Sequence, residues 1–362
     1  MRRVLTGLGL LACIVLAGCA VPTRGYRVVG YISNTEHTDR IDASRIDTLI
    51  YAFAHVDHDA VVLRPDAAAS LAQVVALKQA NPSLRVVISV GGWTADGFSQ
   101  AASSAEGRQR FASSAAQLLA DHHADGLDID WEYPTHGESG IASSPADRVN
   151  FPLLLAATRK ALDALPGHHT LSAAVADGAF VDGVDIPAAN RYLDWFNLMT
   201  YDFNNSLTPT TGHHSGLHPS ARAPADARTG DRAVAQFLAA GVPASKLFIG
   251  AAFYARQFND VQPMANGVYQ RYGKYGGEVP WPELKAKYID MNGFRRYWDA
   301  DAQAPYLWNA TTRSFITYDD PQSIAAKVAF VRKMHLGGVM YWEQSQDTDG
   351  ELLRSVADDK AR

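Results

Sequence analysis

Three carboxylate side chains recur at every second position of one short segment, as Asp128, Asp130 and Glu132. Side chains two residues apart point to the same face of a β-strand, so this spacing predicts three carboxyl groups on one face. Carboxyl groups that close together cannot all ionise at low cost, and the pKa of at least one must rise. A carboxylic acid that is still protonated near neutral pH can act as a general acid. We expect Glu132, the last of the row, to have this role.

A cation site and a solvated strand end are weaker interpretations of the carboxylate row. Carboxylates at alternating positions suit Ca²⁺, but the segment lacks the glycine turn of an EF-hand loop. A solvated strand end is unexpected, because the apolar residues Leu127, Ile129 and Trp131 interleave with the acids. A strand would point these three side chains to the opposite face, where helices should cover them. We therefore favour a catalytic row.

Apolar, strand-like segments alternate with helical segments along most of the chain. Eight segments are nearly continuous in apolar character, as strands buried on both faces should be. They are residues 27–32, 48–54, 85–90, 127–131, 170–175, 195–200, 247–252 and 338–342. Segments with helical periodicity lie between several of them, at residues 67–80, 108–123, 149–165, 232–240 and 321–335. Eight such units predict an α/β fold, a (β/α)8 TIM barrel, whose active site lies at the C-terminal ends of the strands.

One connection is too long for a plain barrel. Residues 258–318 separate the seventh strand from the eighth and are rich in aromatic residues and glycine. A structureless loop of that length would be unusual in a compact domain. We predict a small α+β insertion subdomain at 258–318, within a single catalytic barrel domain at 26–357. Most aromatic side chains of the insertion should form its own core. No room is expected for a carbohydrate-binding module.

The N-terminus has the pattern of an export signal. Arg2 and Arg3 are followed by an apolar run at residues 4–16 and by Ala17-Gly18-Cys19. This end resembles the lipobox of bacterial lipoproteins. The resemblance implies a signal peptide at 1–18, a lipid on Cys19, a tether at 19–25 and an anchor in the membrane. Ala20 then favours the outer membrane. Ordinary secretion is the alternative.

Charge and residue composition argue against nucleic-acid binding, disulfides and metal sites. The formal net charge is −5 and no basic run is present, so no nucleic acid partner is expected. Cys13 and Cys19 are the two cysteines, so removal and acylation leave no thiol for a disulfide or a metal. His213, His214 and His218 cluster in a Gly- and Ser-rich stretch. No familiar metal-ligand spacing completes that group, so we expect a solvated loop, no metal and no cofactor.

At this point the chain resembles glycoside hydrolase family 18, the chitinases and their relatives. The family's Asp-x-x-Asp-x-Asp-x-Glu motif is complete, because Asp125 precedes the row of three carboxylates. Three further motifs occur in the right order: Ser89, Gly91 and Gly92 followed by Trp93; Met199, Tyr201 and Asp202; and Trp342. The seventh strand departs from the family pattern, because Ala252 and Ala255 replace a proline and a glycine before Arg256. That departure puts the shape of the groove in doubt but not the acid.

The resemblance implies a mechanism in which the substrate supplies the nucleophile. Glu132 would protonate the glycosidic oxygen while the 2-acetamido oxygen of the sugar attacks C1 to form an oxazolinium ion. Asp130 would orient the acetamide and share a proton with Asp128, and Tyr201 would hold the acetamide oxygen. The substrate-binding candidates are Trp342, Asp202, Met199, Arg256, Tyr254, Trp93, Tyr133 and Tyr31. The expected supporting residues are Ser89, Gly91, Gly92 and Asp125.

The expected activity is therefore that of a chitinase cutting β-1,4 links between N-acetylglucosamine units, with chitin or an N-acetylglucosamine oligosaccharide as its partner and with retention of configuration. An endo-β-N-acetylglucosaminidase acting on glycoprotein or cell-wall glycans would use the same residues. A non-catalytic chitin-binding lectin is disfavoured, because Glu132 and Asp130 are both present. A monomer is the expected state.

Overall fold

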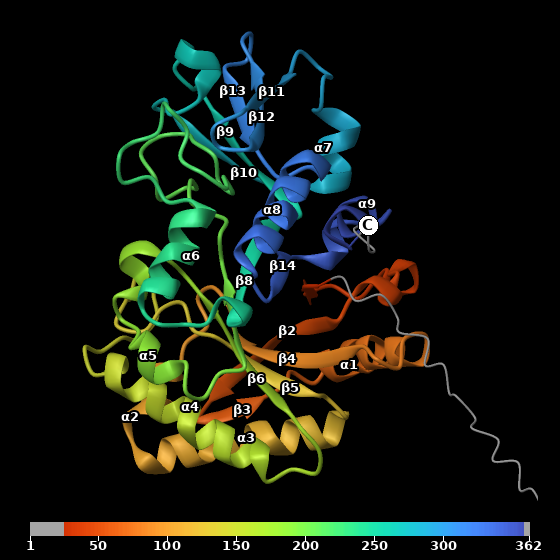
Figure 1. Cartoon of the computed structure of the whole chain (residues 1–362), viewed down its shortest axis with the longest axis vertical. Coiled ribbons are helices and arrows are strands. Elements are labelled where there is room, and N and C mark those ends of the chain that lie inside the picture. Colours follow the sequence, from red (N-terminus) through yellow and green to blue (C-terminus); the bar gives the residue numbers. More distant parts are fainter. Residues whose placement is uncertain (1–24, 358–362) are drawn as a thin grey trace, which may run out of the picture.

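The computed structural model describes residues 25–357 (Figure 1), so the predicted signal peptide and all but the last residue of the tether lie outside the described residues. Eight parallel strands form a closed barrel, because β1 pairs with both β14 and β2. In chain order they are β1 (Arg27–Ile32), β2 (Thr48–Asp57), β4 (Arg85–Gly91), β5 (Gly126–Asp130), β6 (Thr170–Val175), β7 (Trp195–Leu198), β8 (Leu247–Ala252) and β14 (Gly338–Trp342). The predicted (β/α)8 barrel is confirmed.

Helices surround this barrel. They are α1 (Ala67–Ala76), α2 (Phe98–Ser103), α3 (Ala105–His122), α4 (Asp147–Asp163), α5 (Ile186–Ala189), α6 (Gly230–Ala239), α8 (Pro321–Met334) and α9 (Glu351–Ala357). Between β1 and β2 two 3-10 turns take the place of an α-helix. The short strand β3 (Ala60–Val62) is antiparallel to the end of β2. None of the helices at residues 25–357 is long and apolar enough to cross a membrane.

The alternation of side chains divides each barrel strand between two apolar regions. Leu127, Ile129 and Trp131 point outward and join the large core under the helices. Trp131 stacks on Phe98 of α2 at 5.4 Å between ring centroids. A separate cluster, which includes Trp195, fills the inside of the barrel. This division buries both faces of the strands and directs the carboxylates of β5 into the barrel.

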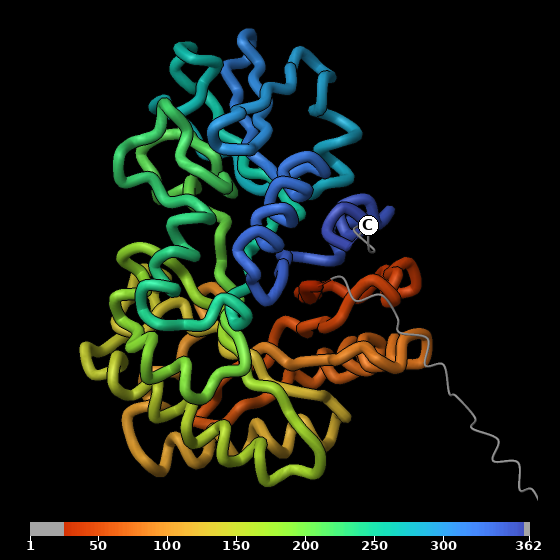
Figure 2. Tube along the Cα trace, viewed as in Figure 1, coloured from red at the N-terminus to blue at the C-terminus, as the bar shows by residue number. Residues whose placement is uncertain are grey.

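The inserted subdomain carries a second sheet. Its five antiparallel strands lie in the order β10-β9-β13-β12-β11, and α7 (Trp281–Lys287) follows the first edge strand. The strands are β9 (Tyr254–Asn259), β10 (Lys274–Pro280), β11 (Arg295–Asp299), β12 (Ala304–Asn309) and β13 (Ser314–Thr317). In Figure 2 the chain leaves the barrel after β8, forms this subdomain at the top of the view and returns through α8. The sheet begins at Tyr254, so the sequence-based boundary at residue 258 falls inside β9.

Aromatic residues of the insertion mostly pack against one another. Phe258, Tyr306, Trp308 and Phe315 are buried in a core of their own, with Tyr272 and Tyr275 against its edge. This small core accounts for the density of aromatic residues in the segment. Tyr275 alone of these also lines the large cavity at the mouth of the barrel.

Candidate active site

A cavity of about 580 Å³ opens at the C-terminal ends of the barrel strands. Its lining includes Asp130 and Glu132 from the end of β5, Tyr201 and Asp202 from the end of β7, and Trp342 from the end of β14. Each of these residues lies at or just past the end of its strand, where neighbouring parallel strands bring their termini together. The geometry unites motifs that lie far apart in the sequence.

Asp128 lies inside the barrel below this cavity and is saturated with hydrogen bonds. Its side chain has no solvent exposure. One carboxylate oxygen accepts from Tyr31 Oη at 2.9 Å and Ser89 Oγ at 2.8 Å; the other accepts from Ser172 Oγ at 2.6 Å and Asn197 Nδ2 at 3.1 Å. Burial raises the pKa of Asp128, and these four donors oppose the rise.

Asp130 has a very different environment, although it is only two residues further along. It is 4% exposed, and its Oδ1 is buried without any hydrogen-bond partner among the described residues. Burial raises the pKa of Asp130 well above its usual value, and the charges of Glu132 and Asp128 add to the rise. Four donors stabilise the charged form of Asp128, whereas no donor among the described residues reaches Asp130 Oδ1, so the surroundings favour the neutral form of Asp130 more strongly than that of Asp128.

Glu132 sits at the rim of the cavity. Burial raises the pKa of Glu132 to about 7, with a further contribution from the negative charge of Asp202 and an opposing one from the Tyr133 hydroxyl. A carboxyl group with this pKa is protonated in a substantial fraction of molecules at neutral pH and can still lose its proton. Glu132 can therefore act first as an acid and then as a base.

The segment after β7 brings three cavity residues together. Met199 and Tyr201 line the cavity wall, and Tyr201 Oη lies 3.7 Å from the sulfur of Met340. Burial raises the pKa of Tyr201 well above its usual value, and the charge of Asp130 adds to the rise. The hydroxyl therefore keeps its proton and can donate a hydrogen bond to a ligand in the cavity.

Asp202 remains charged in the same cavity. Its backbone is left-handed, with φ of 57°, and its carboxylate accepts two hydrogen bonds from Arg256 of β9. Burial opposes ionisation, but contacts with His214 and Arg256 hold the pKa of Asp202 well below its usual range. Tyr254 lies beneath the Arg256 guanidinium at 4.8 Å from the ring centroid.

Several aromatic side chains line the cavity. Trp342 stacks on Phe53 with centroids 5.6 Å apart and an interplanar angle of 19°, and it also contacts Tyr31. Trp93, another lining residue, is 50% exposed and packs edge-on against Tyr133. Exposed aromatic faces of this kind suit the apolar faces of pyranose rings.

Gly91 and Gly92 lie beside the cavity at positions too crowded for a side chain, and Asp125 lies at the far end of β5. Gly91 pairs with Asp130 in the barrel, and a Cβ atom on Gly91 would overlap the Asp130 carbonyl oxygen. Gly92 has φ of 95°, and a Cβ atom there would press on the Phe53 ring. Asp125 lies at the opposite end of β5, where it accepts from the Val86 amide at 2.7 Å. Its place is outside the cavity.

Several cavity residues were not anticipated from the sequence. Phe53, Phe180 and Arg228 line the cavity, and Arg228 forms an ion pair with Asp177. Ser172 of β6 and Asn197 of β7 both donate hydrogen bonds to Asp128. The sequence could have indicated Ser172 and Asn197, because each is a polar residue on the inward face of an otherwise apolar strand. Nothing local distinguishes Phe180, which lies in the 3-10 turn Gly178–Val181, or Arg228, which lies in the loop before α6.

The expectation of a solvated histidine loop is wrong. His213 is 3% exposed and His214 is fully buried. His213 contacts Asp299 of the insertion at 3.0 Å, and His218 contacts Asp231 at 2.7 Å. The insertion covers this loop, which local composition cannot reveal. No group of three or more potential metal ligands occurs among residues 25–357.

Comparisons with known proteins agree with this geometry. The sequence profile described as "Glycosyl hydrolases family 18" matches residues 27–347. Chitinase A1 of Niallia circulans is 38% identical over 312 residues, which cover 81% of this chain but only 45% of that protein. Endochitinase 1 of Metarhizium robertsii is 30% identical over 341 residues, which cover 86% of this chain and 77% of that protein.

A solved structure gives a near-complete match. It is a family 18 N-acetylglucosaminidase from Paenibacillus barengoltzii, 40% identical, with a TM-score of 0.87 over 92% of this chain and 99% of that one. The family profile matches nearly the whole barrel, including the strands that carry the carboxylate row and Trp342. This chain therefore belongs to glycosyl hydrolases family 18.

Proposed function

We propose that the protein is a chitinase that hydrolyses β-1,4 links between N-acetylglucosamine units with net retention, using the substrate's own acetamide as nucleophile. The observation that carries this proposal is that one cavity holds both Glu132, whose pKa is raised to about 7, and a buried Asp130 oxygen that has no hydrogen-bond partner among the described residues. Family membership and relatives named as chitinases support chitin as the substrate.

The cavity offers a partner for each group of the reacting sugar. Trp342 presents an apolar face to the pyranose ring, which places the sugar above Asp130 and Tyr201. The acetamide N–H has an acceptor in the free Asp130 oxygen, and the Tyr201 hydroxyl has a proton to donate to the acetamide oxygen. Both contacts hold that oxygen close to C1, an orientation effect.

The bond changes follow from these positions. Glu132 gives its proton to the glycosidic oxygen as the bond from C1 to that oxygen breaks, and the acetamide oxygen bonds to C1 from the other face. The resulting oxazolinium ion carries positive charge, which the Asp130–Asp128 pair stabilises once its shared proton moves toward Asp128. Water then attacks C1 as the bond from C1 to the acetamide oxygen breaks and the acetamide re-forms, while the Glu132 carboxylate takes a proton from the water. Two displacements at C1 leave its configuration unchanged.

The decisive test compares Glu132→Gln with the wild type. The variant should lose turnover of chito-oligosaccharides by a factor of about 10² to 10⁴ and keep oligosaccharide binding, since the amide matches the shape of the acid but has no acidic proton to give. A variant with wild-type turnover would remove Glu132 from the role of acid. Anomer detection by NMR should find the β-product first, whereas an α-product first would exclude retention.

Product analysis separates chitinase activity from related activities. Chromatography of digests of chito-oligosaccharides, high-mannose glycans and peptidoglycan should give products from the first alone. Release of disaccharides or longer products fits a chitinase, and release of single sugars fits the activity named for the structural relative from Paenibacillus barengoltzii. Cleavage restricted to high-mannose glycans would favour an endo-β-N-acetylglucosaminidase instead.

We propose further that the chain is exported as a lipoprotein, is anchored in the outer membrane through Cys19 and acts as a monomer. The support is the apolar run that ends at Ala17-Gly18-Cys19, which lies outside the described residues. Replacing Cys19 with Ala should move the protein from the membrane fraction to the soluble fraction and abolish labelling by a fatty-acid precursor. Unchanged fractionation would exclude the anchor. Light scattering of the soluble domain tests the monomer.

A further inference from the structure

A fully buried ion pair lies behind the catalytic cavity, outside the residues used above. Lys327 of α8 and Asp319, which follows β13, are 1% and 0% exposed, and Lys327 Nζ lies 2.5 Å from Asp319 Oδ2. Lys327 comes from the helix that returns the chain to the barrel, and Asp319 comes from the exit of the insertion. Neither residue lines the cavity.

The pair contacts the end of a barrel strand beside the cavity. Asp319 Oδ2 accepts from the amide of Ala252 at the end of β8, at 3.0 Å, and Lys327 Nζ donates to the carbonyl oxygen of Gly250 at 3.2 Å. Tyr254 and Arg256 follow Ala252 within a few residues. The ion pair therefore bonds the main chain at the end of β8, a few residues before Arg256, which binds Asp202.

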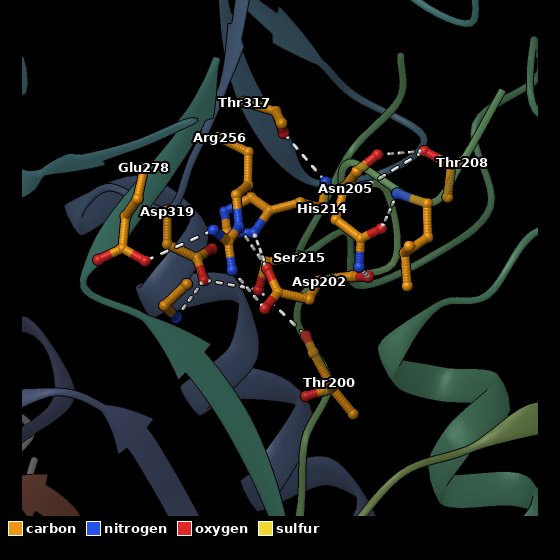
Figure 3. Close-up of polar contacts among 12 residues, drawn as sticks. Thr200, Asp202, Asn205, Thr208, His214, Ser215, Arg256, Glu278, Thr317 and Asp319 are labelled. Carbon is orange, nitrogen blue, oxygen red and sulfur yellow. Dashed lines mark hydrogen bonds and ion pairs between the residues drawn. The ribbon is translucent and has the colours of Figure 1, made fainter. Parts of the chain in front are cut away.

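Ser215 extends the same contacts to β7. Its hydroxyl lies 2.6 Å from Lys327 Nζ, 2.8 Å from Asp319 Oδ2 and 3.1 Å from the Thr200 carbonyl oxygen. Figure 3 shows Ser215 between Asp319 and Thr200, with Asp202 close by. The Thr200 hydroxyl also bonds both the amide and the carbonyl of Gly250, at 2.7 and 3.0 Å. Thr200 directly precedes Tyr201, so this cluster reaches the backbone of a catalytic residue.

A contribution to the stability of the fold does not by itself explain why this ion pair is fully buried. Removing two charges from water costs about as much as their attraction returns, and apolar residues of similar size often stabilise a fold equally well. The hydrogen bonds of Asp319 Oδ2 and Lys327 Nζ are directional and end on Ser215, on the β8 main chain or on the partner ion. Directional bonds to several backbone points restrict position more narrowly than apolar packing does.

We propose that Asp319, Lys327 and Ser215 form a positioning cluster that sets the register of the β7 and β8 ends, and through them the places of Tyr201 and Arg256 in the reaction. This inference rests on the proposed function, because it concerns the same site. None of the three residues lines the cavity. Their effect is on the geometry of the groups that hold and orient the sugar.

Two serine hydroxyls on the same carboxylate provide a matched test. Ser215 bonds Asp319 on the side of the strand ends, whereas Ser323 bonds Asp319 Oδ1 at 2.7 Å and belongs to the N-terminal cap of α8. Ser215→Ala should lower kcat roughly tenfold, since small displacements of orienting groups are costly, with KM little changed. Ser323→Ala should lower the melting temperature through loss of the capping box while kcat stays at the wild-type value.

A second readout is inhibition by a thiazoline analogue of the oxazolinium ion, which depends on the placement of Tyr201. Ser215→Ala should weaken this inhibition by about the same factor as kcat, and Ser323→Ala should leave it unchanged. Wild-type kcat and inhibition in Ser215→Ala would overturn the proposal. So would equal losses in the two serine variants, because these would indicate general loosening of the fold.

The ion pair itself is tested by the double variant Asp319→Leu with Lys327→Met, which avoids leaving one buried charge alone. We expect a folded protein with a cooperative melting transition and kcat reduced at least as much as in Ser215→Ala. A folded double variant with wild-type kcat would refute the positioning role. If it does not fold, the two serine variants decide. The wild type is assayed in parallel. If it lacked chitinase turnover, the proposed function would be refuted. The positioning cluster would still be tested, by thiazoline binding to the same variants.

Discussion

Arg256 binds Asp202 with two nitrogens of its guanidinium, Nε to Oδ1 at 2.7 Å and Nη2 to Oδ2 at 2.6 Å. Asp202 follows a barrel strand, and Arg256 lies on the first strand of the insertion. The pair therefore joins the two parts of the protein at the edge of the cavity. It also keeps a negative charge near Glu132, which contributes to the raised pKa of that acid.

Neutralising Asp202 should move the pH profile of the enzyme. The acid form of Glu132 is needed for the first step, so wild-type kcat/KM should fall as the pH rises through about 7. Because the Asp202 charge raises the pKa of Glu132, Asp202→Asn should shift this descending limb to lower pH. The measurement is kcat/KM on a soluble chito-oligosaccharide from pH 4 to 9. A limb that stays in place would mean that the Asp202 charge does not act on Glu132.

The ionised form of Glu132 should lower the free energy of unfolding at alkaline pH. Its pKa in the folded state, about 7, is above its ordinary value of 4.5, so the folded state binds this proton more tightly than the unfolded state does. Stability from this group is complete below pH 4.5 and is lost as the pH rises toward 7. Glu132→Gln should therefore be more stable than wild type by about 1 to 3 kcal/mol at pH 8, allowing for partial solvent screening. Urea unfolding should reveal no such gain at pH 4.

Tyr31 tests the role of the hydrogen bonds to Asp128. Tyr31→Phe removes one donor at 2.9 Å, so the Asp128 carboxylate is less stabilised and the shared proton no longer rests mainly on Asp130. A lost hydrogen bond to a charged group is worth about 1.5 to 3 kcal/mol, which corresponds to roughly a 10- to 100-fold drop in kcat. Tyr26→Phe is the control, since Tyr26 Oη bonds the Val356 carbonyl outside the cavity. Tyr26→Phe should lower the melting temperature but leave kcat unchanged. Equal drops in kcat for Tyr31→Phe and Tyr26→Phe would contradict a specific role of the Tyr31 hydrogen bond to Asp128.

Trp342 should bind the sugar through its ring face. Trp342→Ala removes the apolar floor and leaves Phe53 without its stacking partner. We expect kcat/KM to fall about 10- to 100-fold, from loss of about 1.5 to 3 kcal/mol of apolar and stacking contact. Trp342→Phe should recover part of this loss. Steady-state kinetics on chito-oligosaccharides provide the measurement, and a similar loss in both variants would argue against a ring-stacking role.

Local sequence pattern was sufficient for the core of the site. The every-second-residue spacing of Asp128, Asp130 and Glu132 is a property of one strand, and the apolar residues between them show which face is covered. The same reasoning located the eight barrel strands and the presence of an insertion. It depends only on backbone periodicity and burial, which act over a few residues.

Closure of the barrel and docking of the insertion decided everything else. Phe53 meets Trp342, and Lys327 meets Ser215, across more than one hundred residues of sequence. His214 lies in a Gly- and Ser-rich stretch that is typical of a solvated loop, but it is buried because the insertion covers it. Such contacts depend on which segments the folded chain brings together, and no local periodicity encodes them. Sequence alone therefore determined the chemistry of the acid row, and only the tertiary structure decided which side chains surround and position it.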